Sequence, residues 1–234
     1  SKPKRQGHAM NWSEQFDIYC ERTDFTYWSE PVNALTNAAF LLAALLMAWR
    51  VSKTPLASGR RIAWTLTGIL FAIGIGSFLF HTHATQWASL ADVTPIGLFI
   101  LLYLFAVGLH FLRLPWWGAG LVTLAFLPYA YVTVPIFDRF PFFAVSNFYW
   151  TVPSLLILFA PFVALRGAPR TAIGMLIGAF ILTISISLRT YDMPICETFP
   201  LGSHFWWHIL NGVMLGWMIE VYRRHMVEHS PDPV

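Results

Sequence analysis

The 234 residues are 56% hydrophobic and only 12% charged, about half the charged fraction of an ordinary soluble domain. So few charged groups cannot cover a soluble globule, and a net charge of +3 gives no basic surface suited to nucleic acid. The apolar residues come in long blocks separated by short polar joints, which is typical of a single polytopic membrane domain.

Seven apolar blocks are each close to the length of about 20 residues that a bilayer-spanning helix needs. We therefore predict an all-α fold, a seven-helix bundle with helices near 32–51, 61–82, 89–112, 116–135, 143–165, 170–188 and 203–225. The expected division is an extracytoplasmic N-terminal segment over 1–31, a membrane domain over 32–225 and a cytoplasmic tail over 226–234. Residues Ser230–Val234 are expected to be disordered.

The basic residues of the joints predict the orientation of the bundle. Joints after the first, third and fifth helices, together with the C-terminal end, hold nine lysines and arginines; the remaining joints hold only Arg139 and Arg189. The positive-inside rule then places the C-terminus in the cytoplasm and the N-terminus outside. Lys2, Lys4 and Arg5 oppose this, but they lie too far from a helix end for the rule to apply.

Polar and ionisable side chains recur at one end of three of these helices, although each costs about 2.5–3.5 kcal/mol at a helix centre. Ser77 and His81 lie four residues apart on one face of the second helix. Asp92 lies near the start of the third helix, and His204 and His208 open the seventh. Because the second helix runs outward and the other two run inward, His81, Asp92, His204 and His208 are all expected at one depth near the outer surface.

Three imidazoles at one depth predict a zinc site. His81, His204 and His208 would leave the fourth tetrahedral position to water, as in catalytic zinc sites. His83 is the alternative to His81, but it points away from the face of Ser77. Each residue also has a structural interpretation when taken alone, as an interfacial histidine, a serine in helix packing or an aspartate at a helix start.

The two cysteines are both expected on the outer side. Cys20 precedes the first helix and Cys196 lies between the sixth and the seventh. That compartment permits disulfides. Position alone leaves open whether the two are bridged or are free thiols.

Taken together, these residues resemble the alkaline ceramidases, in the superfamily that also contains the adiponectin-type receptors. The resemblance is carried by Ser77-x-x-x-His81, by Asp92 eleven residues on, and by the motif that runs from His204 to His208. It is also carried by Tyr19-Cys20-Glu21 and by Glu30-Pro31-Val32-Asn33-Ala34-Leu35-Thr36-Asn37. It spans about residues 17–215 and implies zinc bound by the three histidines, Ser77 and Asp92 beside the water at the metal, and a Cys20–Cys196 disulfide.

The same resemblance implies a calcium site in the acidic N-terminal segment. The corresponding candidates are Asp17, Glu21, Asp24 and Glu30. The stretch from Cys20 to Glu30 is shorter than in the eukaryotic enzymes, which is consistent with a bacterial-type member, and Arg22 replaces an acidic or polar residue. A solvated acidic loop is an equally good interpretation.

The function that the resemblance implies is zinc-dependent hydrolysis of ceramide or a related N-acyl lipid, near the extracytoplasmic face of the membrane. Asp92 would serve as the general base and Ser77 as a hydrogen-bond donor to the developing oxyanion. One alternative is a receptor-like or structural seven-helix protein with a structural zinc site. Another is a transporter with a proton relay, although the ionisable groups that the pattern singles out gather at one end only.

Overall fold

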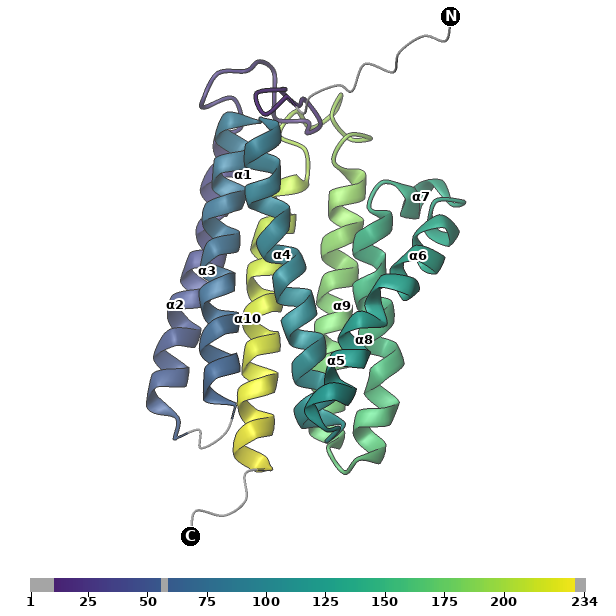
Figure 1. The fold of residues 1–234 in the computed structure, drawn as a ribbon. Helices are drawn as coiled ribbons and strands as arrows, with labels where there is room; N and C mark the ends of the chain where they lie inside the picture. The colour runs from purple at the N-terminus through teal and green to yellow at the C-terminus, as the bar shows by residue number, and fades with distance from the viewer. Residues whose placement is uncertain (1–10, 56–58, 230–234) are drawn as a thin grey trace, which may run out of the picture.

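The fold is a bundle of roughly parallel helices, described here from a computed structural model over residues 11–55 and 59–229 (Figure 1). Helix makes up 76% of the structure, and the described residues form no β-strand. The tail Ser230–Val234 and the basic residues Lys2, Lys4 and Arg5 lie outside the described residues. The all-α prediction is confirmed.

Ten α-helices and one π-helical turn follow one another in the described part of the chain. They are α1 (Pro31–Thr36), α2 (Ala38–Lys53), α3 (Arg60–His83), α4 (Gln86–Ala106), η1 (Val107–Phe111), α5 (Trp116–Leu124), α6 (Phe126–Phe137), α7 (Pro141–Ala144), α8 (Asn147–Leu165), α9 (Pro169–Tyr191) and α10 (His204–Glu228).

Six helical segments of the described chain are long and apolar enough to cross a membrane: Pro31–Lys53, Arg60–His83, Gln86–Phe111, Trp116–Phe137, Asn147–Leu165 and Pro169–Tyr191. They identify a multi-pass membrane protein. The seventh predicted helix, α10, is 25 residues long and is less apolar because it carries residues such as His204, His208 and Glu220. It lies inside the bundle, between α2 and α9 (Figure 1).

Two of the predicted continuous helices are interrupted. The first breaks at Asn37, whose side-chain amide donates to the carbonyls of Asn33 and Ala34 in competition with the backbone ladder. The fourth breaks at Ala125, between α5 and α6. Pro128 explains this break, since its missing N–H leaves the carbonyl of Leu124 without its helical donor.

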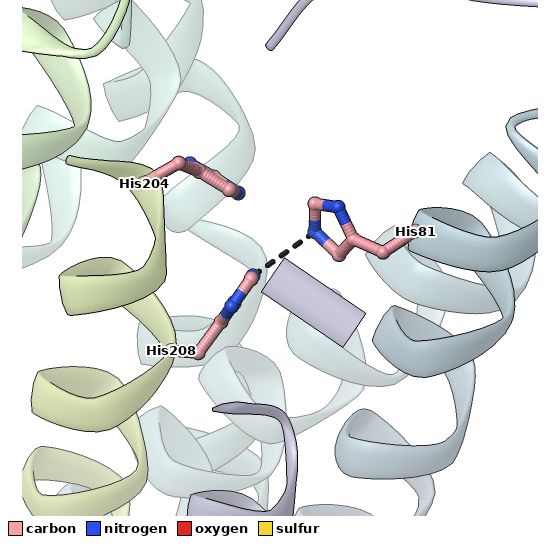
Figure 2. A group of neighbouring side chains, drawn as sticks. All are labelled: His81, His204 and His208. Atoms are coloured by element: carbon pink, nitrogen blue, oxygen red, sulfur yellow. Dashed lines mark hydrogen bonds between the residues drawn. The ribbon is translucent and has the colours of Figure 1, made fainter. Parts of the chain in front are cut away.

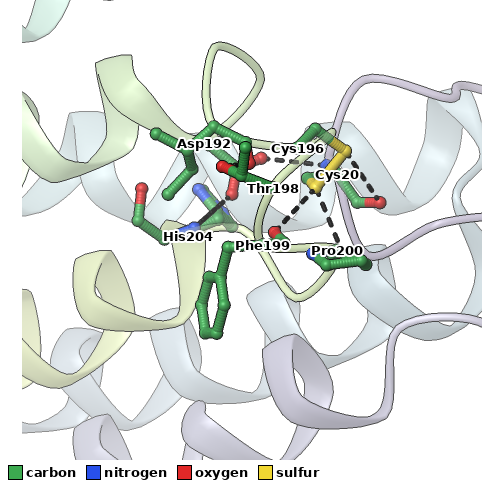
Figure 3. The surroundings of a disulfide bond; sticks show 9 residues. Cys20, Asp192, Cys196, Thr198, Phe199, Pro200 and His204 are labelled. Atoms are coloured by element: carbon green, nitrogen blue, oxygen red, sulfur yellow. Dashed lines mark hydrogen bonds between the residues drawn. A yellow bond between two sulfur atoms is a disulfide. The ribbon is translucent and has the colours of Figure 1, made fainter.

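The N-terminal segment is fastened to the end of the bundle where α3 turns into α4. The backbone N–H of Phe16 donates to Ala84 over 2.8 Å, and that of Gln86 donates to Glu14 over 2.9 Å. The predicted disulfide between Cys20 and Cys196 is present, with Cα atoms 5.4 Å apart (Figure 3). The bridge joins this segment to the loop between α9 and α10, so that both cover the same end of the bundle.

Candidate metal centre

Three buried histidines meet at the covered end of the bundle. His81 lies in the last turn of α3, while His204 and His208 lie one turn apart at the start of α10 (Figure 2). One ring nitrogen from each falls within 4.8 Å of the others, and each residue is at most 1% exposed. A tetrahedral ion with nitrogens at about 2.1 Å holds its ligands roughly 3.4 Å apart, so the spacing suits a metal.

The hydrogen bonds of His81 and His208 turn a lone pair of each ring toward the other. The Nδ1 of His81 lies 2.6 Å from the carboxylate of Glu30, which can only accept, so Nδ1 carries the proton. The hydroxyl of Thr36 donates to the carbonyl of Val32 over 2.7 Å and therefore accepts from Nδ1 of His208 over 2.9 Å. The Nε2 atoms, which are unprotonated when both imidazoles are neutral, then face each other over 3.0 Å. A cation between them would relieve the repulsion of the lone pairs, and carboxylate or hydroxyl partners on the far nitrogen are typical of metal-bound histidines.

Hydrogen bonds at the start of α10 fix the position of His204. The buried carboxylate of Asp192 accepts from the backbone N–H groups of Ser203 and His204, both over 2.8 Å, and from that of Cys20 over 2.9 Å (Figure 3). The ring of Tyr19 stacks on that of His204 with centroids 3.8 Å apart. The buried Nδ1 of His204 has no hydrogen-bond partner in the described structure, so this nitrogen is not engaged by any other protein group there.

Ser77 and Asp92 lie at one end of a largely apolar cavity between the helices. Ser77 is buried one turn before His81, and Asp92 is half-buried on α4. From there the cavity follows α10 from Trp207 to Met218, a length of roughly 16 Å at 1.5 Å per residue. Its shape and lining suit a long apolar chain with a polar group at the end nearest the histidines.

The close approach of α3 and α4 brings Ser77 and Asp92 to the same cavity. It depends on Gly76, where a Cβ atom would lie 2.1 Å from the carbonyl oxygen of Ala91. A glycine lets two membrane helices approach this closely, as small residues commonly do at helix interfaces.

Gly76→Ala is expected to push α4 away from α3 and to destabilise the protein by about 1–3 kcal/mol, the usual cost of overpacking. Thermal unfolding in detergent should show the loss. Gly68→Ala is the matched control, because a Cβ atom at Gly68 on the same helix would meet nothing within 4 Å. Equal melting temperatures for the two variants would contradict this account of the interface.

In the described residues, the four calcium candidates do not belong to a group of three or more side chains that could hold a metal ion. Glu21 accepts from the backbone N–H groups of Val32 and Asn33 over 2.7 and 2.8 Å, and so caps the start of α1. Asp24 accepts from Thr26 at an exposed turn, and Asp17 is exposed. The three histidines are the one group of three or more metal-ligating side chains in the described residues.

Glu30, the fourth candidate, is fully engaged with other partners. Its carboxylate accepts from Nδ1 of His81, from Nε of Arg22 over 2.5 Å and from the side-chain amide of Asn33 over 3.0 Å. Burial raises the pKa of Glu30, but the hydrogen bonds from His81 and Asn33 and the charge of Arg22 outweigh it, so the pKa falls below its ordinary value. Glu30 is therefore ionised and serves His81.

The pKa values of Glu21 and Asp24 shift in opposite directions because their surroundings differ. Burial raises the pKa of Glu21, and the hydrogen bonds from Asn33 and Val32 only partly offset this. The hydroxyl and backbone N–H of Thr26 lower the pKa of Asp24. Glu21 thus caps the start of α1 from a buried position, while Asp24 stabilises a surface turn.

Sequence reasoning assigned no role at the centre to four residues that support it: Thr36, Tyr19, Asp192 and Arg22. A signal existed for Thr36, since polar residues at 30, 33, 36 and 37 form a stripe along the first apolar helix. No local pattern marks Asp192, because it joins the start of α10 to Cys20, which lies 172 residues away in the chain. His83, the alternative ligand, is exposed and packs against Tyr27 and Trp87.

A second polar group lies at the other end of the bundle, where the sequence pattern suggested none. Tyr222 donates to or accepts from Nδ1 of His110 over 2.8 Å, and Thr171 pairs with Nδ1 of His225 over 2.9 Å. Nearby, Glu220 accepts from Arg50, among others. Between the two ends lies the apolar cavity, so the two groups do not form one continuous relay.

The fold and the centre define a class: a multi-pass helical membrane protein with a buried three-histidine cluster at the end of an apolar cavity. The sequence matches the ceramidase family over residues 13–232, nearly the whole chain. The chain belongs to the ceramidase family. A comparison of the sequence with individual curated proteins gives no match.

Proposed function

We propose that the protein is a zinc-dependent hydrolase that cleaves the amide bond of ceramide or a related N-acyl lipid. Membership of the ceramidase family and the buried histidine cluster support a ceramidase-type hydrolase that acts on an amide. One observation carries the proposal further: the Nε2 atoms of His81 and His208 face each other over 3.0 Å beside the cavity end that Asp92 lines.

His81, His204 and His208 would hold the zinc ion. Their nitrogens match its preference, and their far-side partners Glu30 and Thr36 fix the two tautomers that binding requires. When bound, zinc supplies a Lewis acid that polarises a carbonyl group and acidifies a water ligand.

Asp92 is the proposed general base. Its carboxylate lies at the polar end of the cavity, where it takes a proton from the attacking water and later delivers it to the leaving amine. Ser77 lines the same end and donates a hydrogen bond to the carbonyl oxygen as negative charge develops on it. The products are a fatty acid and a long-chain amine.

The apolar cavity holds a hydrocarbon chain of the lipid. Tyr103, Leu155 and Met218 are among its lining residues, and they come from α4, α8 and α10. A chain seated along this length would place the amide at the end that Ser77 and Asp92 line, so binding of the chain positions the bond for attack.

The proposed topology has seven membrane helices with α10 as the last. The N-terminal segment, residues 1–31, is outside, 32–225 cross the membrane, and 226–234 are cytoplasmic. The nine basic residues on one side against two on the other support this orientation, as does the disulfide at the end that holds the histidines. The active site then lies near the extracytoplasmic face.

The test is release of fatty acid from a panel of N-acyl lipids by purified protein in detergent. We expect release to stop when a zinc chelator strips the protein and to return when zinc is added back, because the histidines alone cannot polarise the carbonyl. Magnesium should not restore it, since Mg²⁺ prefers oxygen ligands. Release that continues at full rate without zinc would refute the proposed chemistry.

A further inference from the structure

An arginine is buried beside the candidate metal centre. The side chain of Arg22 is 1% exposed, and its guanidinium donates along three directions. Nε donates to Glu30 over 2.5 Å, Nη1 to the carbonyl of Asp24 over 3.0 Å, and Nη2 to the carbonyl of His81 over 2.9 Å. Burying a charge this completely is costly unless it is paired and hydrogen-bonded, as it is here.

Arg22 constrains His81, the proposed metal ligand, through two interactions. One is direct, through the backbone carbonyl of His81. The other passes through Glu30, which accepts from Arg22 on one oxygen and from the ring of His81 on the other. The guanidinium fork therefore fixes both the end of α3 and the rotation of the imidazole.

The acidic N-terminal segment does not fit a calcium ion. Calcium takes about 6–8 oxygen ligands at about 2.3–2.6 Å. Glu21 is used by two backbone N–H groups of α1, and one oxygen of Glu30 and the carbonyl of Asp24 are both taken by Arg22. Arg22 and the backbone of α1 therefore already engage oxygens that a cation here would need.

We propose that Arg22 is a positioning residue whose fixed charge does the work of a bound divalent cation, holding Glu30 and, through it, His81 in place. The inference rests on His81 being a metal ligand, as proposed above. This role distinguishes the protein from one whose metal centre depends on calcium. The positive charge that orients Glu30 is the guanidinium of Arg22, which is always present.

The first test is the zinc affinity of Arg22→Gln, measured by competition with a chelating dye in detergent. We expect a loss of about 10- to 100-fold, the usual effect of removing an outer partner of a metal ligand. Arg50→Gln is the control, since Arg50 forms an ion pair with Glu220 at the other end of the bundle. It should keep wild-type zinc affinity.

A double-mutant cycle shows whether Arg22 acts through Glu30. If it does, Arg22→Gln should weaken zinc binding little further in a protein that already carries Glu30→Gln. Arg22→Lys, which keeps the charge and loses the fork, should bind zinc with intermediate affinity. That variant supplies the answer if Arg22→Gln does not fold.

The second test adds calcium to the wild-type protein after dialysis and follows the melting temperature. No change is expected up to millimolar calcium. A calcium-dependent rise, or wild-type zinc affinity in Arg22→Gln, would overturn the role of Arg22. A wild-type protein that binds no zinc would instead overturn the metal centre itself, so the two failures are distinct.

Discussion

His208→Ala should lose its zinc and hydrolyse N-acyl lipids at least about 10³-fold more slowly than the wild type. His208 is fully buried at the centre of the cluster, and its Nε2 lies 3.0 Å from that of His81. Without it only two nitrogens remain for the ion. The Lewis acid contributes several kcal/mol to the transition state, and each 1.4 kcal/mol is about tenfold in rate.

The measurements are zinc content by elemental analysis and fatty-acid release by the same preparation. His83→Ala is the matched control, because His83 is exposed two residues from His81 and packs on the neighbouring rings of Tyr27 and Trp87. It should keep both zinc and activity. If His208→Ala retained full activity, zinc held by this cluster would have no part in the reaction.

The meeting of the three histidines could be predicted because it needs only topology. His81 ends one helix and His204 begins another, and the even number of predicted crossings between them, four, places both at one end. The disulfide followed from the same reasoning combined with the family resemblance, and it is confirmed.

The partners that orient those histidines could not be predicted in the same way. Glu30 lies 51 residues from His81, and from sequence it was one of four carboxylates suited to calcium. Only three-dimensional packing shows that Arg22 takes the oxygens which calcium would need. Acidic residues are common in solvated loops, so their spacing alone does not distinguish a cation site from a site for an internal arginine.

Of the two helix breaks, one could have been predicted from the sequence and the other could not. Pro128 could have predicted the break between α5 and α6 because its chemistry is local. The break at Asn37 depends on a side chain that donates back to its own helix, and Asn in a membrane helix has several other uses. Hydropathy averages over such details and therefore reports a continuous span.

Asp92→Asn is expected to keep its zinc and to lose about 10²- to 10⁴-fold in the rate of hydrolysis, the range that general base catalysis contributes. The substitution preserves size, so the packing of α4 and the cavity should be unchanged. Asp92 is not one of the three metal-ligating side chains, so zinc content should equal that of the wild type. Asp138→Asn is the control, since Asp138 is exposed and its carboxylate only accepts from Asn147.

This variant also separates the hydrolase from a protein that keeps zinc merely to hold its helices together. In a structural site the charge of Asp92 has no task, and Asp92→Asn would leave function and zinc untouched. In the hydrolase the same change stops proton transfer while leaving the metal in place. A variant that loses zinc together with activity would instead assign Asp92 to the ligands of the ion, and the base would then have to be sought elsewhere along the cavity.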